Sequence, residues 1–132
     1  MNDLDRRDFV KQTTVAGLAI LARPQRLRWS PSETVRVAVI GVNGRGIVHA
    51  QNYSKLPNSE VAYICDVDAN VIGKGLEGAK GQKRPPKSER DFRRILDDKS
   101  VDAISIAAPD HWHTPMTLLG LHAGKHVYVE KP

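Results

Sequence analysis

The sequence predicts an α/β fold of the Rossmann type, a doubly wound parallel sheet with helices on both faces. Short β-branched runs alternate with helical segments, as in parallel strands joined by helical crossovers. A glycine-rich turn at residues 41–46 follows the first of these runs. Aromatic residues are scarce at 5%, so the core must consist mainly of Val, Ile, Leu and Ala, which suits a sheet buried on both faces.

Four strands and four helices are expected along the chain. Each expected strand is a short, largely apolar run rich in β-branched residues. We place strands at 35–40, 61–66, 101–108 and 126–129, and helices from the turn to about residue 55, after Asp68, at 91–96 and at 116–122. Asp68 is a candidate N-terminal cap, Gly124 a candidate C-terminal cap, and 109–115 is expected to be a loop.

The first 33 residues have the features of an export signal and a linker rather than of the fold. Arg6 and Arg7 precede an uncharged, mainly apolar stretch at 13–22, which is too short for a membrane span. This pattern resembles the twin-arginine signal, although Asp5 stands where Ser or Thr is usual, and it predicts a periplasmic or other extracytoplasmic location. An amphipathic N-terminal helix on a cytoplasmic protein is the alternative. Residues 23–33 are polar and contain proline, as linkers do.

The glycine turn predicts a site for the diphosphate of a dinucleotide. Backbone amides at the start of the following helix can hold such a group. Gly41 permits the sharp turn, and Gly46 permits close packing of the helix on the strand. Asn43 replaces the middle glycine of the G-x-G-x-x-G pattern, but Asn tolerates left-handed backbone geometry. Gly44 beside it allows a phosphate to approach, and Arg45 is placed to contact the phosphates.

Asp66 ends the expected second strand, 20 residues after Gly46. A carboxylate at this position can accept hydrogen bonds from the adenosine ribose hydroxyls, and it repels a 2′-phosphate. No Lys or Arg follows Asp66 immediately, so the sequence favours NAD. Arg45 keeps NADP possible.

The segment after the third expected strand is rich in ring side chains. It leaves the carboxyl edge of the sheet, where open α/β sheets bind ligands. We assign Pro109 and Trp112 to the cofactor site, because the Trp112 ring can stack on a nicotinamide or a sugar. His111 and His113 with one nearby Asp are too few ligands for a metal, so no metal site is predicted.

The last residues form a second candidate group at the same edge, and we assign Glu130 and Lys131 to the cofactor site. Glu130 and Lys131 follow the fourth expected strand, and Pro132 restricts the turn after them. The Lys131 ammonium can hold a substrate hydroxyl or stabilise a developing alkoxide.

Six sequence motifs follow one another between residues 35 and 132. They are the 41–46 turn, Cys65-Asp66-Val67-Asp68, Asp91-Phe92-Arg93-Arg94-Ile95-Leu96, Val101-Asp102-Ala103, Pro109-Asp110-His111-Trp112-His113 and Glu130-Lys131-Pro132. In these motifs and in their order along the chain, the sequence resembles the N-terminal domain of the glucose–fructose oxidoreductase / inositol dehydrogenase (Gfo/Idh/MocA) family.

The resemblance implies an NAD(P)-binding domain of an oxidoreductase that acts on a sugar, cyclitol or related polyol by hydride transfer, usually as a homo-oligomer. It also implies catalytic roles for Lys131, which contacts substrate and cofactor, and for His113, beside the nicotinamide. The family's second, α+β domain supplies the substrate pocket. Residues 34–132 are therefore expected to be a truncated dinucleotide-binding domain that binds nucleotide weakly and catalyses no turnover of substrate. A sugar or polyol substrate is expected to bind only if the second domain is supplied.

Two other functions are compatible with parts of the pattern. A non-catalytic nucleotide-binding relic would keep the glycine turn. An S-adenosylmethionine-dependent methyltransferase also uses such a turn and an acid after its second strand, but 109–113 and 130–132 argue against it. Nucleic-acid binding is not expected, since the whole net charge of +5 lies in residues 74–94, which contain a single aromatic residue. A lone cysteine, Cys65, excludes an internal disulfide and is expected to be buried.

Overall fold

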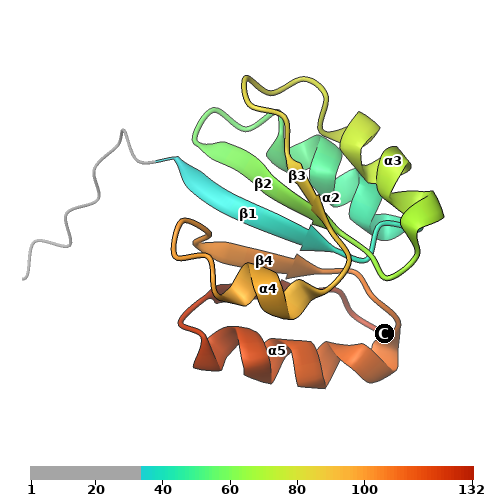
Figure 1. Ribbon diagram of the computed structural model, residues 1–132, viewed down its shortest axis with the longest axis vertical. Helices are drawn as coiled ribbons and strands as arrows, with labels where there is room; N and C mark the ends of the chain where they lie inside the picture. The colour runs from blue at the N-terminus through green and yellow to red at the C-terminus, as the bar shows by residue number, and fades with distance from the viewer. Residues whose placement is uncertain (1–33) are drawn as a thin grey trace, which may run out of the picture. The chain divides into compact units, whose positions relative to one another are not determined.

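The computed structural model describes residues 34–132, so the predicted export signal and linker lie outside the described residues. The described part is a parallel five-stranded sheet in the order β3-β2-β1-β4-β5 (Figure 1). The strands are β1 (Val35–Ile40), β2 (Ser59–Cys65), β3 (Lys87–Glu89), β4 (Ala103–Ile106) and β5 (His126–Val129). The helices are α2 (Arg45–Tyr53), α3 (Ala69–Gly78), α4 (Phe92–Leu96) and α5 (His113–His122), with a 3₁₀ turn η1 (Asp110–Trp112) before α5.

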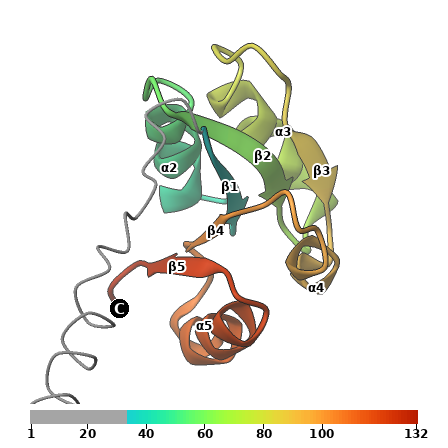
Figure 2. The same cartoon turned by 90° about the vertical axis from the view of Figure 1, so that its left-hand side faces the viewer.

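Helices cover both faces of the sheet, as the predicted doubly wound fold requires. Figures 1 and 2 show α2 and α3 on one face and α4 and α5 on the other. Successive side chains of a buried strand point to opposite faces. Thus Val39 packs in one apolar cluster with Ile72 of α3, whereas Ile40 packs in a second cluster with Ile95 of α4 and Met116 of α5. The predicted Rossmann-type fold is confirmed.

The sheet has one strand more than the sequence predicted. Strand β3 is a three-residue edge strand that pairs with β2 through Tyr63 and Lys87, Ile64 and Ser88, and Cys65 and Glu89. Its residues Lys-Ser-Glu carry no apolar alternation, because an edge strand of this length buries little side-chain surface. Strand β4 covers only the middle of the predicted 101–108 run.

The prediction of a loop at 109–115 is wrong. Residues 110–112 form the 3₁₀ turn η1, and α5 begins at His113 rather than at 116. Pro115 is the third residue of α5, where the backbone amide has no partner within the helix, so proline is tolerated there.

The predicted helix ends are confirmed at two places. The Asp68 side chain accepts a hydrogen bond from the Asn70 amide at 2.9 Å and caps α3. Gly124 follows α5 with a φ of +73°, the left-handed conformation that ends many helices. Within residues 34–132 no helix is both long and apolar enough to cross a membrane.

Candidate functional site

The turn between β1 and α2 has no room for side chains at two of its glycines. Gly41 has a φ of +85°, and a Cβ there would lie 2.6 Å from the backbone nitrogen of Ala108. A Cβ on Gly46 would overlap the carbonyl oxygen of Gly41. Both glycines are therefore required by geometry, as predicted. The left-handed geometry considered for Asn43 is not adopted, because the positive φ falls on Gly41 instead.

The start of α2 is open toward solvent. Asn43, Gly44 and Arg45 are exposed, and a Cβ added to Gly44 would meet no atom within 4 Å. The first turn of the helix contains no acidic residue. Since the first amides of a helix lack partners within it and carry the positive end of its dipole, this surface fits a diphosphate in both shape and charge.

The Asp66 carboxylate lies directly against the glycine turn. Its Oδ2 accepts a hydrogen bond from the Val42 amide at 2.7 Å, and its Oδ1 accepts one from the Asp68 amide at 3.0 Å. These bonds hold the carboxylate at the carboxyl edge of the sheet, one residue beyond the end of β2. Each carboxylate oxygen has a second lone-pair site, so the group can still accept hydrogen bonds from a ligand hydroxyl.

Strands β1, β4 and β5 bring the other predicted residues to the same edge. The Ala107 amide donates to the Ile40 carbonyl at 2.8 Å, and the Glu130 amide donates to the Ile106 carbonyl at 3.0 Å. The parallel register therefore places the ends of these three strands side by side. The glycine turn, the segment after β4 and the Glu130-Lys131 pair all start from them.

The residues after β4 and β5 differ in how firmly they are held. His113 Nε2 donates to the Ala108 carbonyl at 2.7 Å, which directs the ring back toward the segment after β4. Trp112 is 45% exposed, and Pro109 and Lys131 are also exposed. Their contact with cofactor or substrate stays a prediction.

A polar cluster lies between α2 and the ends of β4 and β5. We call it the His49 cluster; it consists of Arg45, His49, Ser105, Tyr128 and Glu130. His49 Nδ1 lies 2.9 Å from Ser105 Oγ, and His49 Nε2 lies 2.8 Å from Glu130 Oε1. The same oxygen accepts hydrogen bonds from Arg45 Nε and from the Tyr128 hydroxyl, each at 3.2 Å.

The charge of Glu130 is stabilised by these neighbours. The hydrogen bond from His49, followed by that from Arg45, lowers the pKa of the Glu130 carboxyl below its ordinary value. In turn, the negative charge of Glu130 raises the pKa of the Tyr128 hydroxyl. Glu130 is therefore ionised at neutral pH and acts as an acceptor only.

Ser105, His49 and Glu130 are connected in the order of a hydrolase triad. Ser105 is fully buried in β4, however, and His49 is only 7% exposed. No substrate carbonyl can reach Ser105 Oγ, so this arrangement cannot perform nucleophilic attack. It supports the edge of the sheet instead.

His49, Ser105 and Tyr128 are the cluster members that the sequence analysis missed. A signal is present for His49 and Ser105. Ser105 is the one hydroxyl residue within the apolar run 103–108, and His49 lies on the buried face of α2 together with Gly46 and Ala50. A polar residue on each of two facing buried surfaces is the pattern that predicts such a pair.

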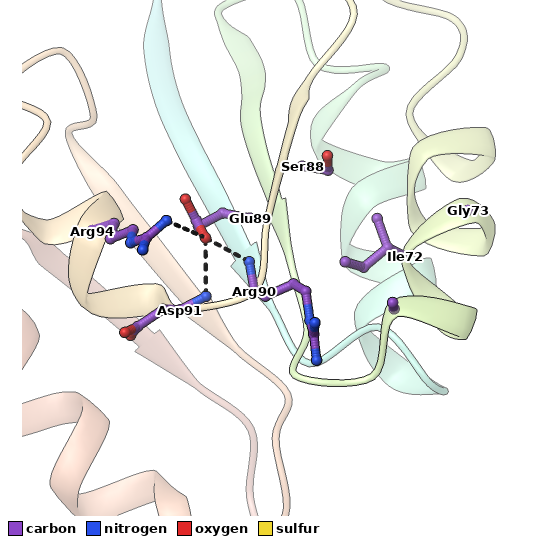
Figure 3. A pocket seen from close by; sticks show the side chains of 8 residues that line it. Ile72, Gly73, Ser88, Glu89, Arg90, Asp91 and Arg94 are labelled. Carbon is purple, nitrogen blue, oxygen red and sulfur yellow. Dashed lines mark hydrogen bonds and ion pairs between the residues drawn. The ribbon is translucent and has the colours of Figure 1, made fainter.

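A surface cavity of about 590 Å³ lies beside α3 and is lined by none of the predicted site residues (Figure 3). Its lining residues are Ala69, Ile72, Gly73, Ser88, Glu89, Arg90, Asp91 and Arg94. The Glu89 carboxylate accepts hydrogen bonds from the amides of Asp91 and Arg90, which lower its pKa. Arg90 donates to the Val67 carbonyl at 3.0 Å. These charged groups are engaged with neighbouring protein atoms.

Metal and thiol chemistry find no support in the described residues. Among residues 34–132 no three His, Cys, Asp or Glu side chains are grouped so that they could hold a metal ion. Cys65 is buried, as predicted, and burial together with the charges of Glu89 and Asp66 raises the pKa of its thiol to about 12. The thiol therefore stays protonated at neutral pH and is a poor nucleophile.

A doubly wound parallel sheet, a glycine turn that opens onto a helix, and a carboxylate after the second strand define a dinucleotide-binding Rossmann domain. The model of the Gfo/Idh/MocA family, described as an oxidoreductase family with an NAD-binding Rossmann fold, matches residues 35–132. The chain belongs to this family. The predicted family is thus confirmed, and NAD is confirmed as the cofactor of the family.

Curated relatives extend well beyond the length of this chain. The alpha-N-acetylgalactosaminidase of Shewanella oneidensis is 29% identical over 157 residues, which cover 100% of this chain and 34% of the relative. A glycosyl hydrolase family 109 protein of Saccharopolyspora erythraea is 37% identical over 155 residues, covering 99% of this chain and 34% of the relative. The chain therefore spans about a third of the length of these relatives.

Solved structures of two inositol dehydrogenases and of an NAD-binding protein share the fold. The scyllo-inositol dehydrogenase of Lactobacillus casei, solved with NAD(H) and scyllo-inositol, matches with a TM-score of 0.66 and 25% identity over 76% of this chain and 28% of that one. The myo-inositol dehydrogenase of the same organism, solved with NAD(H) and myo-inositol, matches with a TM-score of 0.68 and 25% identity. The match covers 75% of this chain and 29% of that one. An NAD-binding protein from Listeria innocua matches with a TM-score of 0.66 and 31% identity, over 76% of this chain and 28% of that one.

Proposed function

We propose that this chain is the NAD-binding part of an enzyme that transfers a hydride between the nicotinamide and a sugar, cyclitol or related polyol. The observation that carries the proposal is the open start of α2 beside the Asp66 carboxylate, in a chain of this family. The inositol dehydrogenases that share the fold support the substrate class. When bound, NAD supplies the hydride acceptor.

The main predicted residues have defined roles in this proposal. The amides at the start of α2 bind the diphosphate, and Asp66 binds the ribose hydroxyls. The Asp66 carboxylate repels a 2′-phosphate, and this favours NAD over NADP. Lys131 holds the substrate hydroxyl, while Trp112 and His113 border the nicotinamide.

Isothermal titration calorimetry of the chain with NAD, NADP and S-adenosylmethionine tests the proposal. We expect NAD to bind, weakly and more tightly than either other ligand. Asp66→Asn should weaken NAD binding about tenfold, because it removes a charged hydrogen-bond acceptor. Asp68→Asn is the matched control, since it removes a carboxylate two residues away and asparagine still caps α3.

Three outcomes would contradict the proposal or part of it. Wild-type chain that binds no NAD would overturn it, and preferential binding of S-adenosylmethionine would establish the methyltransferase alternative. Undiminished NAD affinity in Asp66→Asn would remove Asp66 from the site. We also expect no NADH formation from inositols or sugars by the 132-residue chain, because the substrate pocket of the family lies in its second domain.

Glycoside cleavage is a second candidate, which the names of the curated relatives favour. NAD-dependent glycoside hydrolysis is a known exception to the usual two-carboxylate scheme. In such a reaction the hydride removed from the sugar returns to it, so NADH does not accumulate. A longer protein that contains this chain, assayed with an alpha-N-acetylgalactosaminide, would release free sugar without net NADH, whereas a dehydrogenase would form NADH in proportion to the polyol oxidised.

We further propose that residues 1–33 direct export through the twin-arginine route. A fusion of these residues to a reporter that is active only outside the cytoplasm should give signal. Replacing Arg6 and Arg7 by lysine should abolish it, since the arginine pair is the defining feature of this route. Reporter activity that does not depend on the arginine pair would contradict the proposal.

A further inference from the structure

His49 is a buried polar residue that has no assigned role in the dinucleotide site described above. Its side chain is 7% exposed, yet both ring nitrogens have hydrogen-bond partners, Ser105 Oγ at 2.9 Å and Glu130 Oε1 at 2.8 Å. A buried polar ring costs free energy unless both nitrogens are satisfied. The three residues come from α2, from β4 and from the segment after β5, so the ring ties together elements that are distant in sequence.

In a neutral imidazole, the partners define both the tautomer and the orientation of the ring. An ionised Glu130 only accepts, so His49 Nε2 must donate to it, and Nδ1 then accepts from the Ser105 hydroxyl. The ring also makes edge-on contacts with the rings of Tyr53, at a centroid distance of 6.4 Å, and of Tyr128, at 5.5 Å. Rotation of the imidazole would break two hydrogen bonds and disturb both contacts.

The position of Glu130 depends on this ring. Glu130 directly precedes Lys131. Its carboxylate is held by the buried His49 and by the largely exposed Arg45. Arg45 is 64% exposed, and exposed ion pairs contribute little. The Glu130 amide is held by the Ile106 carbonyl, and His49 is the firmest side-chain contact of the Glu130 carboxylate.

We propose that His49 is the positioning residue of the nicotinamide end of the site: by holding Glu130 it fixes the place from which Lys131 reaches substrate and cofactor. This inference rests on the function proposed above. The diphosphate end does not depend on His49, because Asp66 and the glycine turn are held by their own bonds. Gly46 and Ala50 pack the same face of α2 onto the sheet.

Calorimetry with NAD and with ADP-ribose, which lacks the nicotinamide, separates the two ends. We expect the wild-type chain to bind NAD more tightly than ADP-ribose. His49→Ala should lose about tenfold in NAD affinity and leave ADP-ribose affinity within about twofold, because the lost bond involves a charged group at the nicotinamide end only. His122→Ala, an exposed histidine at the end of α5, is the matched control and should change neither.

Two further variants distinguish positioning from general stability. His49→Gln should restore most of the NAD affinity, since its amide oxygen can accept from Ser105 and its amide nitrogen can donate to Glu130. Ser105→Ala keeps the bond to Glu130 but frees Nδ1, so it should weaken NAD binding only a few-fold; it carries the test if His49→Ala does not fold. Carbon-13 NMR titration of the Glu130 carboxyl should show its pKa rising toward the ordinary value in His49→Ala and not in His122→Ala.

Several results would overturn the inference. Equal losses for NAD and ADP-ribose in His49→Ala would show a purely structural role. Unchanged NAD affinity, or a wild-type chain that binds both ligands equally well, would show that His49 does not serve the nicotinamide end. A wild-type chain that binds neither ligand would instead refute the proposed function itself, and the two failures are thus distinguishable.

Discussion

Gly46 is the residue at which the turn between β1 and α2 tolerates change least. A Cβ at this position would overlap the Gly41 carbonyl oxygen and approach the Gly41 carbonyl carbon to 2.9 Å. Both are backbone atoms and cannot move aside as a flexible side chain can. We predict that Gly46→Ala lowers the free energy of unfolding by about 3 kcal/mol, measured by urea denaturation.

Gly73 provides the control for this substitution. It is exposed in α3, and a Cβ there would meet no atom within 4 Å. Because alanine restricts the unfolded chain and favours helix, Gly73→Ala should raise stability by about 0.5–1 kcal/mol. Similar losses for both variants would show that the turn is not the close contact described here.

The residues of the candidate site were predictable to different degrees, for a physical reason. Gly41, Gly46 and Asp66 follow from local rules, since a turn and a strand end reveal themselves in neighbouring residues. His49 and Ser105 depend on the approach of α2 to β4, which are 56 residues apart at this contact. A local signal marks each of them as a buried polar residue, but tertiary packing decides which partner it contacts.

The same distinction applies to the secondary-structure elements. The bounds of β1 and β5 are confirmed to the residue because each is a largely apolar run that ends at a clear break, Gly41 after β1 and Glu130 after β5. Strand β3 was missed because its pairing with β2 is made by backbone groups, which its side chains Lys87, Ser88 and Glu89 do not report. Helix α5 begins three residues before its predicted start, and its first turn accepts Pro115 because the backbone amide there has no partner within the helix.

The turn between α4 and β4 is predicted to be acid-sensitive. The Asp98 carboxylate accepts hydrogen bonds from the amide and hydroxyl of Ser100 and, at 2.9 Å, from the Tyr63 hydroxyl of β2. These bonds, those from Ser100 first, lower its pKa from 3.8 to about 2. A depressed pKa stabilises the fold fully above the unfolded value, and this stabilisation is lost as pH falls from about 4 to about 2.

Melting temperature measured against pH checks this prediction. Asp98→Asn should be less stable than wild type at pH 6, and the difference should shrink as pH falls toward 2. Asp97→Asn is the control, since it removes an exposed carboxylate from the same turn, and its profile should run parallel to that of wild type. A difference between Asp98→Asn and wild type that is constant with pH would mean that the carboxylate charge does not contribute.

At the scale of the described domain, parallel topology gathers the chemistry at one place. The glycine turn, Asp66, the segment after β4 and the Glu130-Lys131 pair are separated along the chain, yet all follow the carboxyl ends of strands. A parallel sheet aligns those ends at one edge, so each candidate residue reaches the same surface without a long loop. The helices that return the chain to the opposite edge provide the two apolar layers that hold the sheet.

The outer side of this domain leaves apolar side chains in contact with solvent at one end of the sheet. Leu118 and Leu121 of α5 are 53% and 55% exposed. Exposed apolar surface of this kind is favourable to bury in an association. We predict that residues 34–132 self-associate in a concentration-dependent way, seen by sedimentation velocity between about 10 and 300 μM, a span wide enough to cover weak complexes.

Replacing both leucines by glutamine should shift the protein toward monomer and change the free energy of unfolding by less than about 0.5 kcal/mol per site, as expected for exposed positions. Leu56→Gln is the control, because Leu56 is equally exposed, at 52%, but lies in the turn before β2 rather than on α5. If the association surface is on α5, this control should sediment as wild type does. A wild-type domain that stays monomeric over the whole range would contradict the predicted self-association. A loss of association in Leu56→Gln alone would place the interaction elsewhere, because the hydrophobic contribution follows the apolar area that is covered.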